Sequence, residues 1–236
     1  MKNRKFWNWK NQADGSEPRV LELYGTIAED SWFDDDVTPQ MFRDELFSGT
    51  GDVVIWLNSP GGDCIAASQI YSMLMDYKGH VTVKIDGVAA SAASVIAMAG
   101  TKVLMAPTAL MMIHNPATMA CGDHNDMKEA IRMLDEVKES IINAYTLKTG
   151  LGHDEISKFM EQTTWMNANK AIELGFADGM LEDEKKKEVQ NISFAFSESA
   201  VNKALFNKIA EKTPKQTKAQ GRSVDSLMER LNLIRN

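Results

Sequence analysis

Hydrophobic residues along this chain of 236 residues recur with two different periods. Some short runs are continuous or alternate with polar residues, as in strands, and others place apolar residues three or four positions apart, as in amphipathic helices. The pattern predicts strands at 20–27, 53–57, 81–85, 102–105 and 110–113, and helices at 39–49, 66–77, 89–99, 127–145, 154–160 and 168–174. Because strands and helices alternate, we expect an α/β fold.

Two consecutive units of the chain have the same order of strand, turn and helix. The strand at 53–57 is closed by a glycine-containing turn at 58–62. The strand at 81–85 is followed by a predicted turn at 86–88 and then by a helix of small residues at 89–99. These units predict strand–helix turns that stack on one another.

Both ends of the chain differ in composition from its middle. Residues 1–18 hold three aromatic residues among Asn, Lys, Gly and Pro, and they predict an N-terminal arm outside the core. Residues 183–236 begin with a charge run, continue as a linker rich in Lys, Gln and Thr, and end in an amphipathic stretch. This predicts a flexible C-terminal tail with a short helix near its end. The folded domain is therefore expected at 19–182.

Charge is unevenly distributed over the chain, whose net charge is −7. Residues 197–236 hold eight basic and four acidic side chains, a net +4, whereas residues 1–196 hold 18 basic and 29 acidic ones, a net −11. An acidic body disfavours binding to nucleic acid. No apolar run reaches eighteen residues, so we expect no membrane span. The N-terminus does not resemble a signal peptide and there are only 2 Cys, which predicts a cytoplasmic protein.

The two turns offer backbone N–H groups that side chains do not obstruct. Gly61 and Gly62 expose such groups after the first strand, and the residue after Ser91 exposes another at the start of a helix. Two converging N–H groups form an oxyanion hole, which makes Ser91, with its small neighbours, a candidate nucleophile. The alternative is that glycine, alanine and serine are present here only because they let helices pack closely.

A serine hydroxyl needs a base within hydrogen-bonding distance to act as a nucleophile at neutral pH. Of the four histidines, His80, His124 and His153 lie in polar surroundings that are typical of the surface. His114 follows the apolar strand at 110–113, so it lies at the carboxyl end of a strand, where α/β proteins place their sites. His114 is therefore the candidate base, although a histidine at a strand end is also found as a structural residue.

The sequence contains no evident metal-binding set or cofactor motif. Cys64 and Cys121 have no Cys-x-x-Cys partner, which favours small buried residues over a redox pair. The acidic run at 34–36 and the histidines lack a metal-ligand spacing, and no glycine loop followed by Lys-Ser or Lys-Thr is present for ATP. We therefore expect neither a metal nor a cofactor.

Four sequence blocks, taken together, are more specific than any single motif. They are Asn58-Ser59-Pro60-Gly61-Gly62, Gly87-Val88-Ala89-Ala90-Ser91, Met112-Ile113-His114-Asn115-Pro116 and the segment at 168–178, which ends Ala-Ile-Glu-Leu-Gly-Phe-Ala-Asp. In order and approximate spacing, they resemble the proteolytic subunit of the caseinolytic (Clp) protease family. The resemblance covers roughly residues 18–182.

This resemblance implies a Clp/crotonase-type fold of stacked β-β-α turns with a helical segment, and a serine endopeptidase activity. Matched residue by residue, Ser91 would be the nucleophile, His114 the general base, and the backbone N–H groups of Gly62 and Ala92 the oxyanion hole. The substrates would be unfolded or flexible protein or peptide chains. The chain would assemble with copies of itself into a ring, or into stacked rings, around an inner chamber. Whether an unfoldase ATPase docks on that ring is left open.

One position departs from the family pattern. In the family an acidic residue, usually Asp, orients the histidine, and the matching position here is Thr163. A threonine hydroxyl accepts an N–H bond from imidazole but has no full charge to stabilise imidazolium. Glu161 is the nearest acid, and its side chain would point the same way as that of Thr163 on a strand but not on a helix. The third member of the triad is thus unassigned.

Narrower and rival interpretations stay open beside this one. The acidic body, the block Trp165-Met166-Asn167-Ala168 and the long C-terminal tail most resemble the Clp-like head maturation proteases of bacteriophages and prophages, which process capsid or scaffold proteins in the assembling prohead. Thr163 also keeps open a catalytically silent ring or scaffold subunit. A crotonase-like acyl-CoA enzyme is less favoured, because it normally uses acidic catalysts and no Ser-His pair.

Overall fold

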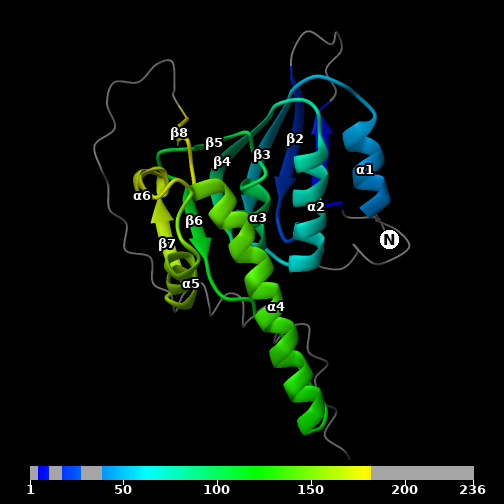
Figure 1. Ribbon diagram of the computed structural model, residues 1–236. Coiled ribbons are helices and arrows are strands. Elements are labelled where there is room, and N and C mark those ends of the chain that lie inside the picture. Colours follow the sequence, from blue (N-terminus) through cyan, green and yellow to red (C-terminus); the bar gives the residue numbers. More distant parts are fainter. Residues whose placement is uncertain (1–4, 11–17, 28–38, 182–236) are drawn as a thin grey trace, which may run out of the picture. The chain divides into compact units, whose positions relative to one another are not determined.

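In a computed structural model of the protein, residues 5–10, 18–27 and 39–181 are described, and they form one sheet covered by helices (Figure 1). The expected α/β class is confirmed. The strands are β1 (Trp7–Lys10), β2 (Arg19–Tyr24), β3 (Val53–Ser59), β4 (Val81–Ala90), β5 (Lys102–Met105), β6 (Leu110–Ile113), β7 (Thr164–Asn167) and β8 (Gly179–Met180). The helices are α1 (Pro39–Phe47), α2 (Cys64–Asp76), α3 (Ala92–Ala97), α4 (His124–Thr149), α5 (His153–Glu161) and α6 (Ala168–Glu173). The predicted tail at 183–236, with its short helix, lies outside the described residues.

The sheet divides at β4, and this division positions the candidate site. The main path runs in the order β1-β2-β3-β4-β5-β8, with parallel pairs except between β1 and β2. Residues 82–85 of β4 pair with β5, whereas residues 88–90 pair with β6. β6 in turn pairs with β7 in antiparallel fashion. The carboxyl ends of β4 and β6 therefore lie side by side.

The predicted turn at 86–88 is wrong, because β4 continues to Ala90, and the helix predicted at 89–99 is present but shorter, as α3 at Ala92–Ala97. The strand is extended by its pairing with β6 and by the pairing of Ala89 with Ser59. The side-chain oxygen of Asn58 accepts a hydrogen bond from the N–H of Val88 at 3.1 Å. This bond ties the segment predicted as a turn, 86–88, to the neighbouring strand. The small residues at 87–90 therefore lie in a closely packed strand and not in a helix.

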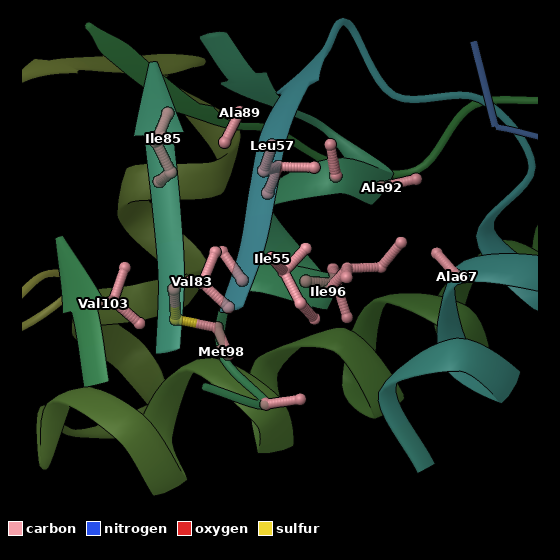
Figure 2. Packing of buried hydrophobic residues seen from close by; sticks show 14 of the residues in the cluster. Ile55, Leu57, Ala67, Val83, Ile85, Ala89, Ala92, Ile96, Met98 and Val103 are labelled. Carbon is pink, nitrogen blue, oxygen red and sulfur yellow. The ribbon is translucent and has the colours of Figure 1, made fainter. Parts of the chain in front are cut away.

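The core lies between the central strands and the helices that cover one face of them. Ile55 of β3 and Val83 of β4 are fully buried, and Figure 2 shows them packed against Ile96 and Met98 of the α3 segment. Buried and half-buried positions alternate along both strands, as expected for parallel strands with one face in the core. This packing holds α3 against the sheet.

The expected N-terminal arm differs in part from the structure. β1 pairs with β2 along its length, and the side chain of Trp7 is only 3% exposed. The indole Nε1 of Trp7 donates to Glu45 at 2.7 Å, and the ring lies edge-on to Phe42. Trp7 and Trp9 alternate with the exposed Asn8 and Lys10, as side chains do along a strand with one buried face. Residues 7–10 are thus an edge strand of the fold.

The helix expected at 127–145 is confirmed and is longer than predicted. Asp123 and Asp126 form a capping box at the start of α4, and Gly150, at φ 73°, ends the helix in the left-handed region. In Figure 1, α4 extends well past the end of the sheet. Its buried residues all lie in the last third of the helix, at Ile141, Ile142, Ala144 and Tyr145. The first half of α4 is therefore not packed on the described part of the chain.

Candidate active site

Ser91 lies in a sharp connection between β4 and α3. Its backbone has φ 55° and ψ −128°, a conformation that residues with a Cβ rarely adopt. The Ser91 N–H donates to the carbonyl of Met112 at the end of β6, at 2.9 Å. A strained strand-to-helix turn of this kind presents a serine hydroxyl at the edge of a sheet.

His114 directly follows β6, and the structure brings it to Ser91. Nε2 of His114 lies 2.8 Å from Oγ of Ser91. The β4–β6 register explains this contact. Ala90 pairs with Met112, so the segments that follow the two strands start side by side. When Nδ1 carries the ring proton, Nε2 is free to accept the serine hydrogen.

The imidazole of His114 is half-buried, and this burial lowers its pKa below the usual 6.5. Burial disfavours the charged form of a histidine, so the ring is neutral at pH 7. No carboxylate of the described residues contributes to the shift. The base is therefore ready to accept a proton, but the imidazolium that forms has no acidic partner in the described part of the chain.

The glycine turn after β3 packs directly on the Ser91 turn. A Cβ placed on Gly61 would lie 2.8 Å from Cβ of Ser91 and 3.1 Å from the backbone N of Ala92. A Cβ on Gly62 would lie 2.1 Å from the carbonyl oxygen of Ile27, so only glycine fits there. Asp63 then caps α2 by accepting the N–H groups of its first turn at 2.8 Å, which fixes the end of the glycine turn.

Two backbone N–H groups in the turns beside Ser91 have no acceptor among the described residues. Ala92 is the first residue of α3, a position whose N–H has no partner within the helix. The N–H of Gly62 makes no hydrogen bond within the described residues, although its neighbours Gly61 and Asp63 both bond to Ile27. Both groups are available to an oxygen atom bound beside Ser91.

Thr163 and His114 both lie directly beyond the end of the β6–β7 pairing. The last pair of that register is Ile113 with Thr164, and His114 and Thr163 are the next residues of the two segments. Thr163 also has a positive φ of 51°, which it shares only with Ser91 among the described non-glycine residues. The position that bears an acid in the resembling family is thus beside the histidine but uncharged.

Glu161 does not take the place of the missing acid. It lies at the end of helix α5, not on a strand, and its carboxylate accepts from Nζ of Lys138 at 3.0 Å. That hydrogen bond lowers the pKa of Glu161, and the side chain is 59% exposed. The carboxylate is therefore engaged with α4 rather than with His114.

The remaining candidates lie away from this site or lack reactive features. His80, His124 and His153 are exposed, and His153 contacts Glu139 and Asp154. Burial raises the pKa of the half-buried Cys64 thiol, so it is not an activated thiolate. Among the residues that the structure describes, no three His, Cys, Asp or Glu side chains are grouped for a metal ion. None of the described helices has the length and apolar character needed to cross a membrane.

Sequence reasoning missed a buried hydrogen-bonded pair behind the Ser91 turn. Oγ of Ser94 donates to the Ser91 carbonyl at 2.6 Å and lies 2.7 Å from the Tyr145 hydroxyl. The sequence gives only a weak signal of this pair. Ser94 stands in a run of small apolar residues, and Tyr145 is the one polar tip on the apolar face of α4.

Comparisons with known proteins find relatives of this chain. The family model described as Clp protease matches residues 16–184. An ATP-dependent Clp protease proteolytic subunit of Porphyromonas gingivalis is 34% identical over 137 residues, which are 57% of this chain and 62% of that protein. Subunit 1 of Chlamydia muridarum is 32% identical over 141 residues, or 58% of this chain and 73% of that protein. The subunit of Ligilactobacillus salivarius is 28% identical over 180 residues, or 71% of this chain and 91% of that protein.

The family match covers most of the chain and spans strands β2 to β8, the glycine turn, Ser91 and His114. The chain covers less than two thirds of the Porphyromonas gingivalis protein but nearly three quarters of the Chlamydia muridarum one. The sequence resemblance to this family is therefore confirmed, and the chain belongs to the Clp protease family.

Proposed function

We propose that this protein is a serine endopeptidase that cleaves unfolded or flexible protein chains, with Ser91 as nucleophile and His114 as general base. The observation that carries this proposal is the 2.8 Å contact between Nε2 of His114 and Oγ of Ser91 at a strained turn. A structural histidine would not require the serine to adopt an unfavourable backbone conformation. Strain of this kind is typical of groups held in place for a reaction.

The mechanism is acyl transfer in two steps. Oγ of Ser91 attacks the peptide carbonyl while Nε2 of His114 takes its proton, and the N–H groups of Gly62 and Ala92 hold the oxyanion of the tetrahedral intermediate. The C–N bond then breaks as His114 gives the proton to the leaving amine. Water, activated by His114 in the same way, releases the acyl group from Ser91.

Within the described residues, the reaction runs on a Ser-His pair without a charged third member. Thr163 leaves the imidazolium without a carboxylate, so its formation is less favourable than in a complete triad. The oxyanion hole and the Ser-His contact do not depend on that carboxylate. We therefore place the protein among slow serine peptidases rather than silent subunits.

Assembly into a ring, or into stacked rings, belongs to the same proposal. The names of the relatives describe proteolytic subunits of ATP-dependent proteases, which favours a chamber formed by copies of this chain and served by an unfoldase ATPase. The first half of α4 supports this, since Ile131 is 59% exposed and Met133 46% exposed on the part of the helix that the described residues do not bury. Exposed apolar side chains on such an uncovered segment make it a candidate for a contact between subunits.

The narrower role that we propose is that of a phage or prophage protease, with capsid or scaffold proteins as substrates in the cytoplasm or in the assembling prohead. Its support is the sequence resemblance alone, in the acidic body and the block at 165–168. Co-expression with the capsid and scaffold proteins of a tailed bacteriophage tests this role. Shortened capsid or scaffold chains with the wild type but not with Ser91→Ala would support it, and intact chains in both would count against it.

Covalent labelling tests the peptidase function. We expect the intact mass to rise by one fluorophosphonate adduct on the wild type and by none on Ser91→Ala, because only a serine with a base and an oxyanion hole reacts quickly. The matched control is Ser72→Ala on α2, whose hydroxyl only bonds the Ser68 carbonyl and which should label like the wild type. A folded, assembled wild type that takes no adduct would instead establish the silent subunit.

A further inference from the structure

Behind the Ser91 turn, two buried hydroxyls form a chain that ends on the Ser91 carbonyl. We infer that Ser94 and Tyr145 are positioning residues, which hold the peptide between Ser91 and Ala92 so that the Ala92 N–H faces the oxyanion. This inference rests on the proposed peptidase function and adds two residues that act through the backbone. Neither hydroxyl is expected to touch the substrate.

The direction of each hydrogen bond follows from counting protons. Oγ of Ser94 has one hydrogen and donates it to the Ser91 carbonyl at 2.6 Å. In the 2.7 Å contact with Tyr145, Ser94 is therefore the acceptor and the tyrosine O–H is the donor. The N–H of Ser94 also donates to the Ser91 carbonyl, at 2.9 Å. The Ser91 carbonyl oxygen thus accepts two hydrogen bonds from Ser94, and the one from the Ser94 hydroxyl is supported by the Tyr145 hydroxyl.

Burial makes these hydrogen bonds effective. Ser94 is 0% exposed and Tyr145 1% exposed, so no bulk water competes for either hydroxyl. Burial also raises the pKa of Tyr145, which keeps the phenol protonated and able to donate. A buried network with all its members satisfied is rigid.

The planarity of the peptide unit carries this constraint to the proposed oxyanion hole. The Ser91 carbonyl and the Ala92 N–H belong to one planar trans unit, so they point in opposite directions. Holding the carbonyl toward Ser94 and the interior therefore turns the Ala92 N–H away from the interior. Because Ser91 has a strained φ of 55°, this peptide would relax to another orientation without such a hold.

Tyr145 is itself firmly anchored. Its ring meets that of Phe176 edge-on, with the centroids 5.6 Å apart. The same end of α4 is tied down by Lys148, whose Nζ donates to Asp178 at 2.7 Å and to the Gly100 carbonyl at 3.3 Å. The hydroxyl that supports the Ser91 turn thus comes from a separate, fixed element.

The first experiment removes the two hydroxyls one at a time. In Tyr145→Phe and Ser94→Ala, we expect kcat to fall by about tenfold, less than for outright loss of an oxyanion-hole donor. KM for a fluorogenic peptide amide should stay within about twofold, since ground-state binding is not touched. Each rate is normalised to the number of active sites that a fluorophosphonate labels when labelling is complete. A smaller fraction of folded protein therefore does not lower the reported kcat. A peptide boronic acid, which forms a tetrahedral anion on serine, should lose affinity by about the same factor as kcat.

The matched control is Tyr77→Phe, which also removes a tyrosine hydroxyl bonded to a backbone carbonyl, 2.8 Å away at Gly51. Tyr77 lies at the end of α2 and has no contact with Ser91, so the rate per labelled site should not change. A merely structural role for Tyr145 would lower the number of labelled sites and leave the rate per site and the boronate affinity as in the wild type. That result would overturn the inference.

The double variant tests whether Tyr145 acts through Ser94. Ser94→Ala/Tyr145→Phe should be no slower per site than Ser94→Ala alone, because the tyrosine has nothing left to support. A fall equal to the product of the two single effects would contradict the chain of hydrogen bonds. Wild-type protein that neither labels nor cleaves would refute the peptidase function and this inference together, whereas normal wild-type activity with an unchanged Tyr145→Phe would refute the inference alone.

Discussion

At the scale of single residues, Thr163 is the position where a small change has the largest expected effect. Like His114, it directly adjoins the last pair of the β6–β7 register, and its φ of 51° suits Asp or Asn better than a β-branched residue. Thr163→Asp should therefore fold well and raise kcat by about tenfold or more, because a carboxylate fixes the tautomer and stabilises the imidazolium. Thr163→Asn is the matched neutral control, and steady-state peptide cleavage is the measurement. Equal rates in both variants would show that charge beside His114 is not what limits the reaction.

The lowered pKa of His114 predicts the acidic side of the pH profile. His114 must be neutral to accept the serine proton, so activity is full above its pKa and falls as the pH drops through it. Since burial lowers that pKa, kcat/KM should hold down to below pH 6.5 before it falls. In Thr163→Asp the added carboxylate favours the charged imidazole, and the midpoint should move to higher pH. A wild-type midpoint above 6.5 would reveal an acidic partner for His114.

At the scale of elements, periodicity predicts most strands and helices but fails where pairing overrides it. The runs at 102–105 and 110–113 are strands as predicted, because apolar β-branched and long side chains suit a buried strand. β4 is the exception, because pairing with β6 extends the strand through Gly87 to Ala89 and Ala90. A single sequence contains no signal for a partner strand twenty residues away.

Local sequence signals predict some residues of the candidate site, and contacts between distant segments determine the others. Ser91 was a candidate because of its small neighbours at a predicted helix start, and His114 because it follows an apolar strand, but the pairing of β4 with β6 that brings them together had no sequence signal. The contact between Ser94 and Tyr145 joins residues 51 positions apart on α3 and α4, and no local pattern records it. The engagement of Glu161 by Lys138 is likewise a contact between two helices that only the fold supplies.

The edge strand β1 and helix α1 are joined by Arg19, which allows a test at this scale. Its guanidinium donates to the carbonyls of Glu45 and Leu46 at 2.6 Å, at the C-terminal end of α1, and stacks on Trp9 at 4.2 Å. Arg19→Ala should lower the free energy of unfolding by about 1–3 kcal/mol, because two charge-assisted hydrogen bonds are lost. Urea denaturation measures this. Arg19→Lys keeps the charge but not the planar fork, so it should recover less than half of the loss, and full recovery would show that charge alone matters.

At the scale of the whole molecule, the uncovered half of α4 predicts association. Ile131 and Met133 are about half exposed on the first half of α4, which the described residues do not bury, and burying the exposed part of such side chains stabilises a contact by about 1 kcal/mol each. Sedimentation velocity should show a large species for the wild type and smaller ones for Ile131→Lys/Met133→Lys. Lys128→Ala, an exposed change on the same helix, is the control and should assemble normally. A wild type that is monomeric at every concentration yet cleaves protein at full rate would exclude a chamber, whereas loss of assembly together with loss of protein cleavage would link α4 to the activity.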